Sequence, residues 1–193
     1  MSPAGPTTFT AMRDATPEDY EIIGRHGVEF FLGLPDRIVT HLQLLGADTG
    51  GYAVDRLTHS LQSATRPKRD GRDDEYVVCA LLHDMGDTQA SANHADLAAA
   101  VLEPYVSERN HWIVKHHAIF QGCYFFHHLG LDRNLRDGYR DHPYWRDAAE
   151  FCEKYDQNCF DPAYDTLPLE AFLPLVRGVF AVQKKSIYVE PAA

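Results

Sequence analysis

Two adjacent residues whose side chains can bind metals, His83 and Asp84, end an apolar run that starts at Tyr76. Further side chains of the same two kinds lie before and after the pair in the chain: His59, His94, His117 and Asp156. Imidazole nitrogens and carboxylate oxygens are ligands that suit transition-metal ions. Four imidazoles and two carboxylates together can hold a pair of such ions.

Asp84 is the natural bridge in such a site. Successive residues of an α-helix point about 100° apart, so His83 and Asp84 cannot approach one ion in parallel directions. A carboxylate has two oxygens, however, and can bind a different ion with each, which places two ions about 3.5–4 Å apart. Each ligating imidazole also needs a partner for its second ring nitrogen, and Asp87 and Asp165 are candidate carboxylates for this role.

The plainer alternative is that these histidines have no shared role, since a His-Asp dipeptide is unremarkable in a chain with 11 histidines. The ordered set favours a metal site, because each member falls on or beside a predicted helix. His59 and His83 also lie among apolar neighbours, where an unpaired imidazole would be costly. We expect at most one of His116, His127 and His128 to touch a substrate. Surface or structural roles are expected for the rest: His26, His41, His111 and His142.

The elements that must position these ligands are helices, because no segment alternates with the period of a β-strand. Thr16 and Pro17 are a typical helix start, and the first helix is predicted to run to about Gly33. Further helices are predicted after Pro35, from Val54 to a break at Pro67, from about Asp73 to Gly86, from a cap at Asn93 to Leu102, from Ser107 through His117, from Ala148 to Asp156, and from Leu169 to about Val182. We therefore predict an all-α bundle, with a flexible leader at residues 1–15 and one domain over residues 16–193.

Composition limits the classes of partner. At 193 residues, of which 45% are hydrophobic, the chain can bury a sizeable core. Its net charge of −10 disfavours nucleic acid and anionic membranes, since an acidic surface repels phosphate. No apolar stretch approaches the ~20 residues that span a bilayer, and no signal peptide is recognised, so a cytoplasmic protein is expected. The cysteines show no CxxC spacing and are interpreted as structural thiols: Cys79, Cys123, Cys152 and Cys159.

The ligand set resembles that of the HD-domain superfamily, which is named for its metal-binding His-Asp pair. The matching residues are His59 in the segment 57–62, the pair in the segment 81–86, and then His94, His117 and Asp156. The sequences His-Ser-Leu-Gln at 59–62, Lys-His-His at 115–117 and Lys-Tyr-Asp at 154–156 are similar to the oxygenase branch that contains myo-inositol oxygenase and the hydroxyphosphonate oxygenases. The resemblance covers about residues 53–180.

This resemblance implies two iron ions. His59, His83, Asp84 and Asp156 would hold one of them, while Asp84, His94 and His117 would hold the other. It further implies a mixed-valent Fe(II)/Fe(III) pair as cofactor, O₂ as co-substrate and no organic cofactor. In that branch the substrate hydroxyl is held at one iron, hydrogen is removed from the carbon that bears it, and the adjacent C–C or C–P bond breaks. Asp84 and His117 would be the catalytic residues.

Asp87 departs from the pattern of the superfamily. Many of its phosphate-acting hydrolases, and myo-inositol oxygenase, have a lysine three residues after the aspartate, and a phosphonate oxygenase of the branch has a histidine there. An ionised carboxylate cannot donate a hydrogen bond to a phosphate oxygen and repels the dianion. Asp87 therefore disfavours phosphohydrolysis and leaves a phosphonate without its usual contact.

Aromatic residues follow His117 closely: Phe120, Tyr124, Phe125 and Phe126. A packed aromatic core would explain them, but rings near an acidic residue can also hold a quaternary ammonium group. The second interpretation predicts a small hydroxylated zwitterion, such as a trimethylammonium hydroxyphosphonate, whose phosphonate would bind one of four basic residues: Lys115, Arg133, Arg136 or Arg140. The candidate substrate contacts are then Asp87, His116, Gln121, Tyr124 and Arg133.

Three functions are compatible with these residues. The first is an O₂-dependent diiron oxygenase that acts on a small hydroxylated substrate. The second is a binuclear HD phosphohydrolase that uses water to cleave a nucleotide or phosphate ester, which Asp87 disfavours. The third is a degenerate HD module that binds a ligand or partner without turnover, which the complete ligand set disfavours. The sequence does not indicate an oligomeric state.

Overall fold

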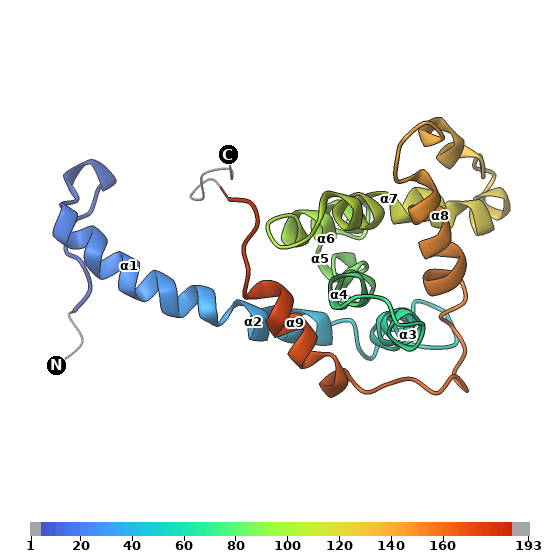
Figure 1. The fold of residues 1–193 in the computed structure, drawn as a ribbon, viewed down its shortest axis with the longest axis horizontal. Helices are drawn as coiled ribbons and strands as arrows, with labels where there is room; N and C mark the ends of the chain where they lie inside the picture. The colour runs from blue at the N-terminus through green and yellow to red at the C-terminus, as the bar shows by residue number, and fades with distance from the viewer. Residues whose placement is uncertain (1–4, 187–193) are drawn as a thin grey trace. The chain divides into compact units, whose positions relative to one another are not determined.

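The computed structural model describes residues 5–186, and all of its regular elements are helices. No β-strand occurs within these residues (Figure 1), which confirms the predicted all-α bundle. The described residues form two compact units, one up to Ile38 and one from Val39 on. Compactness does not decide whether the two units unfold together, so a single domain over residues 16–193 stays a prediction.

The first unit contains the predicted helix start at Thr16. Its side chain accepts a hydrogen bond from the backbone N–H of Asp19, and the Asp19 carboxylate accepts one from the backbone N–H of Thr16 at 2.9 Å. This reciprocal capping starts helix α1 (Pro17–Leu32), which ends one residue before the expected Gly33. Residues 1–4 of the predicted leader lie outside the described residues, and Met12–Asp14 form a 3₁₀ turn.

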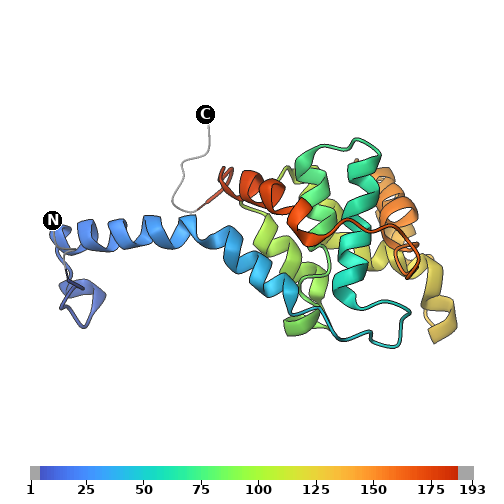
Figure 2. The same ribbon diagram turned by 90° about the horizontal axis from the view of Figure 1, so that it is seen from below.

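The helices of the second unit form a bundle, and three of them start with a side-chain cap. Asp55, Asp73 and Ser107 accept hydrogen bonds from backbone N–H groups of the first turns of α3, α4 and α7. The bounds are α2 (Leu34–Gln43), α3 (Arg56–Arg69), α4 (Asp74–Leu82), α5 (Asp87–Ala90), α6 (His94–Leu102), α7 (Glu108–Phe125), α8 (Trp145–Phe151) and α9 (Leu173–Phe180). Figure 2 shows α3 and α4 packed side by side.

Helix α4 is the central element, because every residue from Tyr76 to Leu82 is buried. It packs against α3, α7 and α9 (Figure 1). A helix that is apolar all round is stable only when other helices cover it on all sides. The His-Asp pair follows directly after its last residue, so the metal-binding side chains are anchored by the best-packed helix of the unit.

Several predicted helix bounds were wrong. Helix α4 ends at Leu82 and not at Gly86, so the His-Asp pair follows the helix, and the last helix begins at Leu173 and not at Leu169. Pro67 does not break α3, which runs on to Arg69, because the missing proline N–H removes one hydrogen bond from its last turn only. The boundary at Asn93 is as predicted, since Asn93 directly precedes α6, although its side chain makes no capping bond. The helix expected up to Asp156 ends at Phe151 and continues as a π-helical turn, Cys152–Asp156.

No helix among residues 5–186 combines the length and the apolar character needed to cross a bilayer.

Candidate metal centre

The first group of ligands meets beyond the end of α4. The Nε2 atom of His59 lies 3.2 Å from Nε2 of His83, 3.3 Å from Oδ2 of Asp84 and 3.3 Å from Oδ1 of Asp156. The Nε2 atom of His83 lies 3.3 Å from Oδ2 of Asp84 and 3.7 Å from Oδ1 of Asp156. Helix α3, the turn after α4 and the π-helical turn after α8 thus bring two imidazoles and two carboxylates together.

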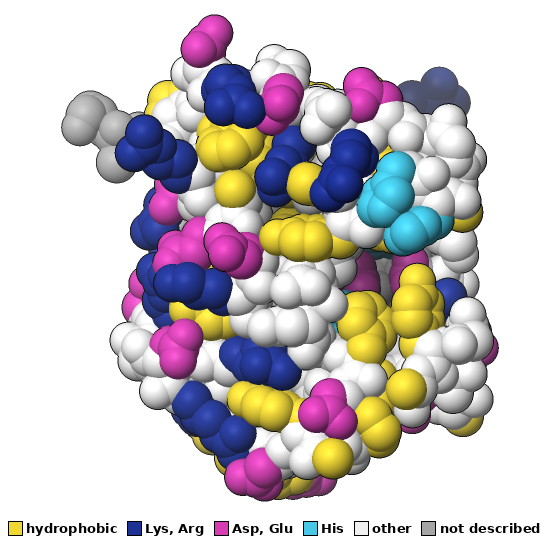
Figure 3. Space-filling view, turned by 90° about the vertical axis from the view of Figure 1, so that its right-hand side faces the viewer, with side chains coloured by type: hydrophobic (Ala, Val, Ile, Leu, Met, Phe, Trp, Pro, Cys, Tyr) yellow, Lys and Arg dark blue, Asp and Glu magenta, His cyan; other side chains and the backbone are white. Residues whose placement is uncertain are grey.

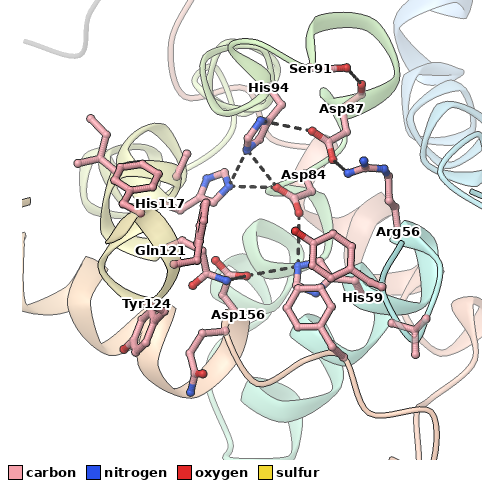
Figure 4. Close-up of a pocket in the computed structure, with 18 of the residues that line it drawn as sticks. Arg56, His59, Asp84, Asp87, Ser91, His94, His117, Gln121, Tyr124 and Asp156 are labelled. Atoms are coloured by element: carbon pink, nitrogen blue, oxygen red, sulfur yellow. Dashed lines mark hydrogen bonds and ion pairs between the residues drawn. The ribbon is translucent and has the colours of Figure 1, made fainter. Parts of the chain in front are cut away.

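The second group lies at the other oxygen of Asp84. Its Oδ1 is 3.1 Å from Nε2 of His117 and 3.4 Å from Nε2 of His94 (Figure 4). The two Nε2 atoms are 3.2 Å apart. The structure therefore brings all six predicted ligands together, and the two oxygens of Asp84 face different groups, as expected for a bridge.

Backbone carbonyls fix the tautomer of three of the four imidazoles. The Nδ1 atoms contact the carbonyl oxygens of Cys159 for His59, of Ala80 for His83 and of Val114 for His117, at 3.1, 2.8 and 2.7 Å. A carbonyl oxygen only accepts hydrogen bonds, so each Nδ1 carries the hydrogen and donates it. In the neutral imidazole, Nε2 then presents its lone pair to the centre of the group.

This donor set fits metal ions. Lone pairs 3.2 Å apart, beside carboxylate oxygens, repel one another unless a cation lies between them. Imidazole nitrogens bind transition metals at about 2.0–2.1 Å, so neighbouring ligand atoms of one ion are about 3 Å apart. The observed separations of 3.1–3.7 Å match that spacing. His83 is fully buried, and Oδ2 of Asp156 is buried without a hydrogen-bond partner. Buried, unpaired polar atoms of this kind are expected of metal ligands.

The charges in the first group favour a cation as well. Burial alone would lower the pKa of His59, but the carboxylates of Asp156 and Asp84 raise it to about 9. Burial similarly opposes the charge of His83, whose pKa the same carboxylates hold well above its usual range. The imidazoles in turn hold the pKa of Asp84 well below its usual range against the effect of burial. The carboxylates stabilise positive charge on the protonated imidazoles, and a bound metal ion can supply that positive charge in place of the protons.

A glycine allows the second group to form. A Cβ atom at Gly86 would lie only 2.4 Å from the carbonyl oxygen of His94 and 2.8 Å from its Cα. The turn that follows the His-Asp pair therefore packs directly against the start of α6. That contact brings His94 to Asp84, so glycine at position 86 is a steric requirement.

The π-helical turn positions the last ligand. The backbone N–H of Gln157 bonds to the carbonyl oxygen of Cys152 at 3.0 Å, five residues back, where an α-helix would bond four back. The turn ends at Asp156 and holds its carboxylate between His59 and His83. Such turns interrupt α-helices mostly at functional sites.

A cavity of about 530 Å³ opens onto both groups. Figure 3 shows a hollowed face with acidic side chains inside it and hydrophobic side chains beside it. Aromatic residues form much of the wall: Tyr52, Tyr124, Phe125, Phe126 and Phe160. The ring of Phe160 stacks between those of His59 and Tyr52, with centroid distances of 4.5 and 4.8 Å. The fourth ring predicted after His117, Phe120, is instead buried in the core.

The predicted substrate contacts divide into two sets. Asp87, Gln121 and Tyr124 line the cavity, and the Gln121 side-chain N–H donates to Oδ1 of Asp156 at 2.9 Å. His116 and Arg133 do not line it. His116 points away because successive helical residues diverge, and its ring stacks on Trp112. Arg133 is exposed in the segment after α7.

None of the four basic residues proposed for an anionic group lines the cavity: Lys115, Arg133, Arg136 and Arg140. Arg56 does line it and was missed, as were Tyr52 and Phe160. A signal was present for Arg56, which precedes His59 by three positions on the same helix α3, a spacing that places both side chains on one face. Phe160 lies beyond the end of the π-helical turn, so helical spacing does not relate it to Asp156.

No protein-family model matches the chain, and no curated protein matches it. Membership of the HD-domain superfamily stays a prediction based on the ligand residues.

Proposed function

We propose that the chain is an O₂-dependent diiron oxygenase, which cleaves the C–P or C–C bond next to a hydroxyl-bearing carbon of a small polar substrate. The observation that supports it most is that the two carboxylate oxygens of Asp84 face different histidines. Its Oδ2 faces His59 and His83, while its Oδ1 faces His94 and His117. Two iron ions held in this way would supply the one-electron redox chemistry that O₂ requires.

The two groups offer different numbers of ligands. The first has four residues, including the second carboxylate Asp156, whereas the second has Asp84, His94 and His117 only. A metal position with fewer protein ligands keeps room for exogenous ligands, as catalytic sites do and structural sites do not. This inequality supports a role in catalysis. The cavity gives a small molecule access to the second group, since His94 and His117 both line it.

The cavity wall supports a cationic or apolar substrate body. Arg56 is the only basic side chain among the described lining residues other than the histidines, and its guanidinium contacts Asp87 and Asp48. The rings of the wall and the carboxylate of Asp55 suit a quaternary ammonium group. We therefore favour a 1-hydroxyalkylphosphonate with a trimethylammonium end as substrate.

This reaction needs no external reductant. The C–H and C–P bonds of the substrate supply the electrons that reduce O₂, and the two oxygen atoms end in a carboxylate and in phosphate. Within the protein, Gln121 holds Asp156 in place, and the backbone carbonyls at Cys159, Ala80 and Val114 keep the imidazole lone pairs directed inward. We infer a cytoplasmic location, because the four cysteines are free and buried, as a reducing compartment would keep them.

The second candidate, a binuclear phosphohydrolase, would use the same ligands. Neither candidate finds a free basic side chain in the described wall, because Arg56 is paired with Asp87 and Asp48, so the metal ions would have to hold the phosphorus-bearing group in both cases. Oxygen uptake separates the two.

Metal content and oxygen uptake test the proposal. The protein is purified, its metals are measured, and an EPR spectrum is recorded after partial reduction. We expect two irons per chain, a signal from a coupled Fe(II)/Fe(III) pair that changes when a hydroxyphosphonate is added, and O₂ uptake with release of phosphate. Zinc or manganese together with phosphatase turnover and no O₂ uptake would contradict the proposal.

A further inference from the structure

His94 differs from the other three ligating histidines in the partner of its second ring nitrogen. Its Nδ1 lies 3.3 Å from Oδ1 of Asp87, whereas the other three contact backbone carbonyls. The second oxygen of Asp87, Oδ2, accepts a hydrogen bond from the Arg56 guanidinium (Figure 4). The Nε atom of Arg56 lies 3.7 Å from Oδ2 of Asp48. Side chains from α3 and α5 thus connect to the first residue of α6.

We propose that Asp87 is a positioning residue for His94, held by Arg56, and that it sets the affinity of the second metal position. This inference rests on the proposed metal pair. An ionised carboxylate can only accept a hydrogen bond, so the hydrogen of His94 lies on Nδ1 and the Nε2 lone pair faces Asp84 and His117. The departure of Asp87 from the superfamily pattern then serves a ligand of the metal and not the substrate.

His94 needs such a partner more than the other histidines do. Its side chain is 23% exposed, against 6% or less for His59, His83 and His117. Surrounding side chains therefore restrain its ring less. It is also the first residue of α6, where Asn93 makes no capping bond. The contact with Asp87 is the polar contact that fixes the ring orientation from the side opposite Asp84.

The charge of Asp87 matters as well as its shape. A carboxylate behind an imidazole raises the basicity of the nitrogen that binds the metal. Asp84, which is shared with the first group, is the only carboxylate among the ligands of the second group. The electron density that Asp87 adds to Nε2 of His94 therefore acts at the metal position with fewer ligands. Arg56 occupies Oδ2 and keeps the carboxylate directed at His94.

Cobalt titration of the metal-free protein tests the inference through binding and not through turnover. Co(II) is added to the wild type and to Asp87→Asn. Binding of the first and of the second Co(II) ion per chain, called the first and second equivalents, is followed by absorption and by competition with a chelator. We expect the first equivalent to bind Asp87→Asn as it binds the wild type, and the second to bind about 10–100-fold more weakly. Arg56→Gln should weaken the second equivalent in the same direction by a smaller factor.

The ion pair of Arg69 with Asp165 provides matched controls. It also joins α3 to a carboxylate, at 2.7 Å, but the Asp165 side chain is 93% exposed. Asp165→Asn and Arg69→Gln change the same charges and should bind both equivalents like the wild type. Thermal unfolding of each variant shows whether it is folded.

The outcomes separate this inference from the proposed function. Two tight equivalents in both the wild type and Asp87→Asn would overturn the role of Asp87 while leaving the metal pair intact. An equal loss in Asp165→Asn would overturn it too, because the effect would then be one of overall charge. A wild type that binds fewer than two equivalents would overturn the metal pair and this inference together.

Discussion

Replacing Gly86 by alanine should damage the second metal position selectively. The added Cβ would lie 2.4 Å from the carbonyl oxygen and 3.0 Å from the carbonyl carbon of His94, whereas ordinary contacts begin at 3.4 Å. The start of α6 must therefore retreat by about 1 Å to restore normal packing. Gly86 has φ −74° and ψ −15°, a helical conformation that alanine adopts readily, so the perturbation is steric and not conformational.

The size of the effect follows from two opposing contributions. Overpacking of a tight contact costs about 1–3 kcal/mol. Alanine in a helical conformation recovers up to about 1 kcal/mol relative to glycine. We expect a net loss of about 1–2 kcal/mol in the free energy of unfolding. The Nε2 atom of His94 would move with its backbone away from Asp84 and His117, now 3.4 and 3.2 Å distant. The second metal equivalent should then bind at least about 10-fold more weakly.

Urea denaturation and Co(II) titration measure the two effects. Gly178→Ala is the control, because Gly178 lies inside α9 and an added Cβ there would have nothing within 4 Å. This variant should be as stable as the wild type or more so, with both metal equivalents unchanged. A Gly86→Ala protein that matches the wild type in stability and in both equivalents would refute the claim that position 86 must be glycine.

Two further predictions concern the first group. The raised pKa of His59, about 9 against the ordinary 6.5, means that the metal-free protein has its full stabilisation from this group below pH 6.5 and loses it as the pH rises towards 9. Thermal unfolding from pH 6 to pH 10 should show this loss, on the order of 3 kcal/mol at most, and a bound metal should abolish the dependence. Gln121→Leu removes the hydrogen bond to Oδ1 of Asp156, so metal binding at the first position should weaken about 10-fold. Equal affinity in a chelator competition would contradict that role.

The ligand residues could be predicted from the sequence because their chemistry restricts the choice. Buried imidazoles such as His59 and His83 need a partner, and an adjacent carboxylate can bridge two ions. The structure brings these side chains together as expected. The helix starts at Thr16, Asp73 and Ser107 were equally accessible, because a capping side chain acts within its own helical turn.

The substrate wall could not be predicted in the same way. Which basic side chain lines a cavity depends on contacts between helices, and the pair of Arg56 with Asp87 joins positions 31 residues apart. The same holds for the ring of Phe160, which reaches His59 across the bundle. Helical periodicity also cannot reveal the π-helical turn, because one extra residue in a turn leaves the apolar pattern of α8 intact.

The extra residue in the turn Cys152–Asp156 affects how this site can be found in other chains. Any alignment that treats the segment from Trp145 to Asp156 as an unbroken α-helix shifts the last ligand by one position. A protein with a regular helix here would carry the equivalent carboxylate one residue earlier and present it in the same direction. Searches for this ligand pattern should therefore allow a one-residue gap between Phe151 and Asp156.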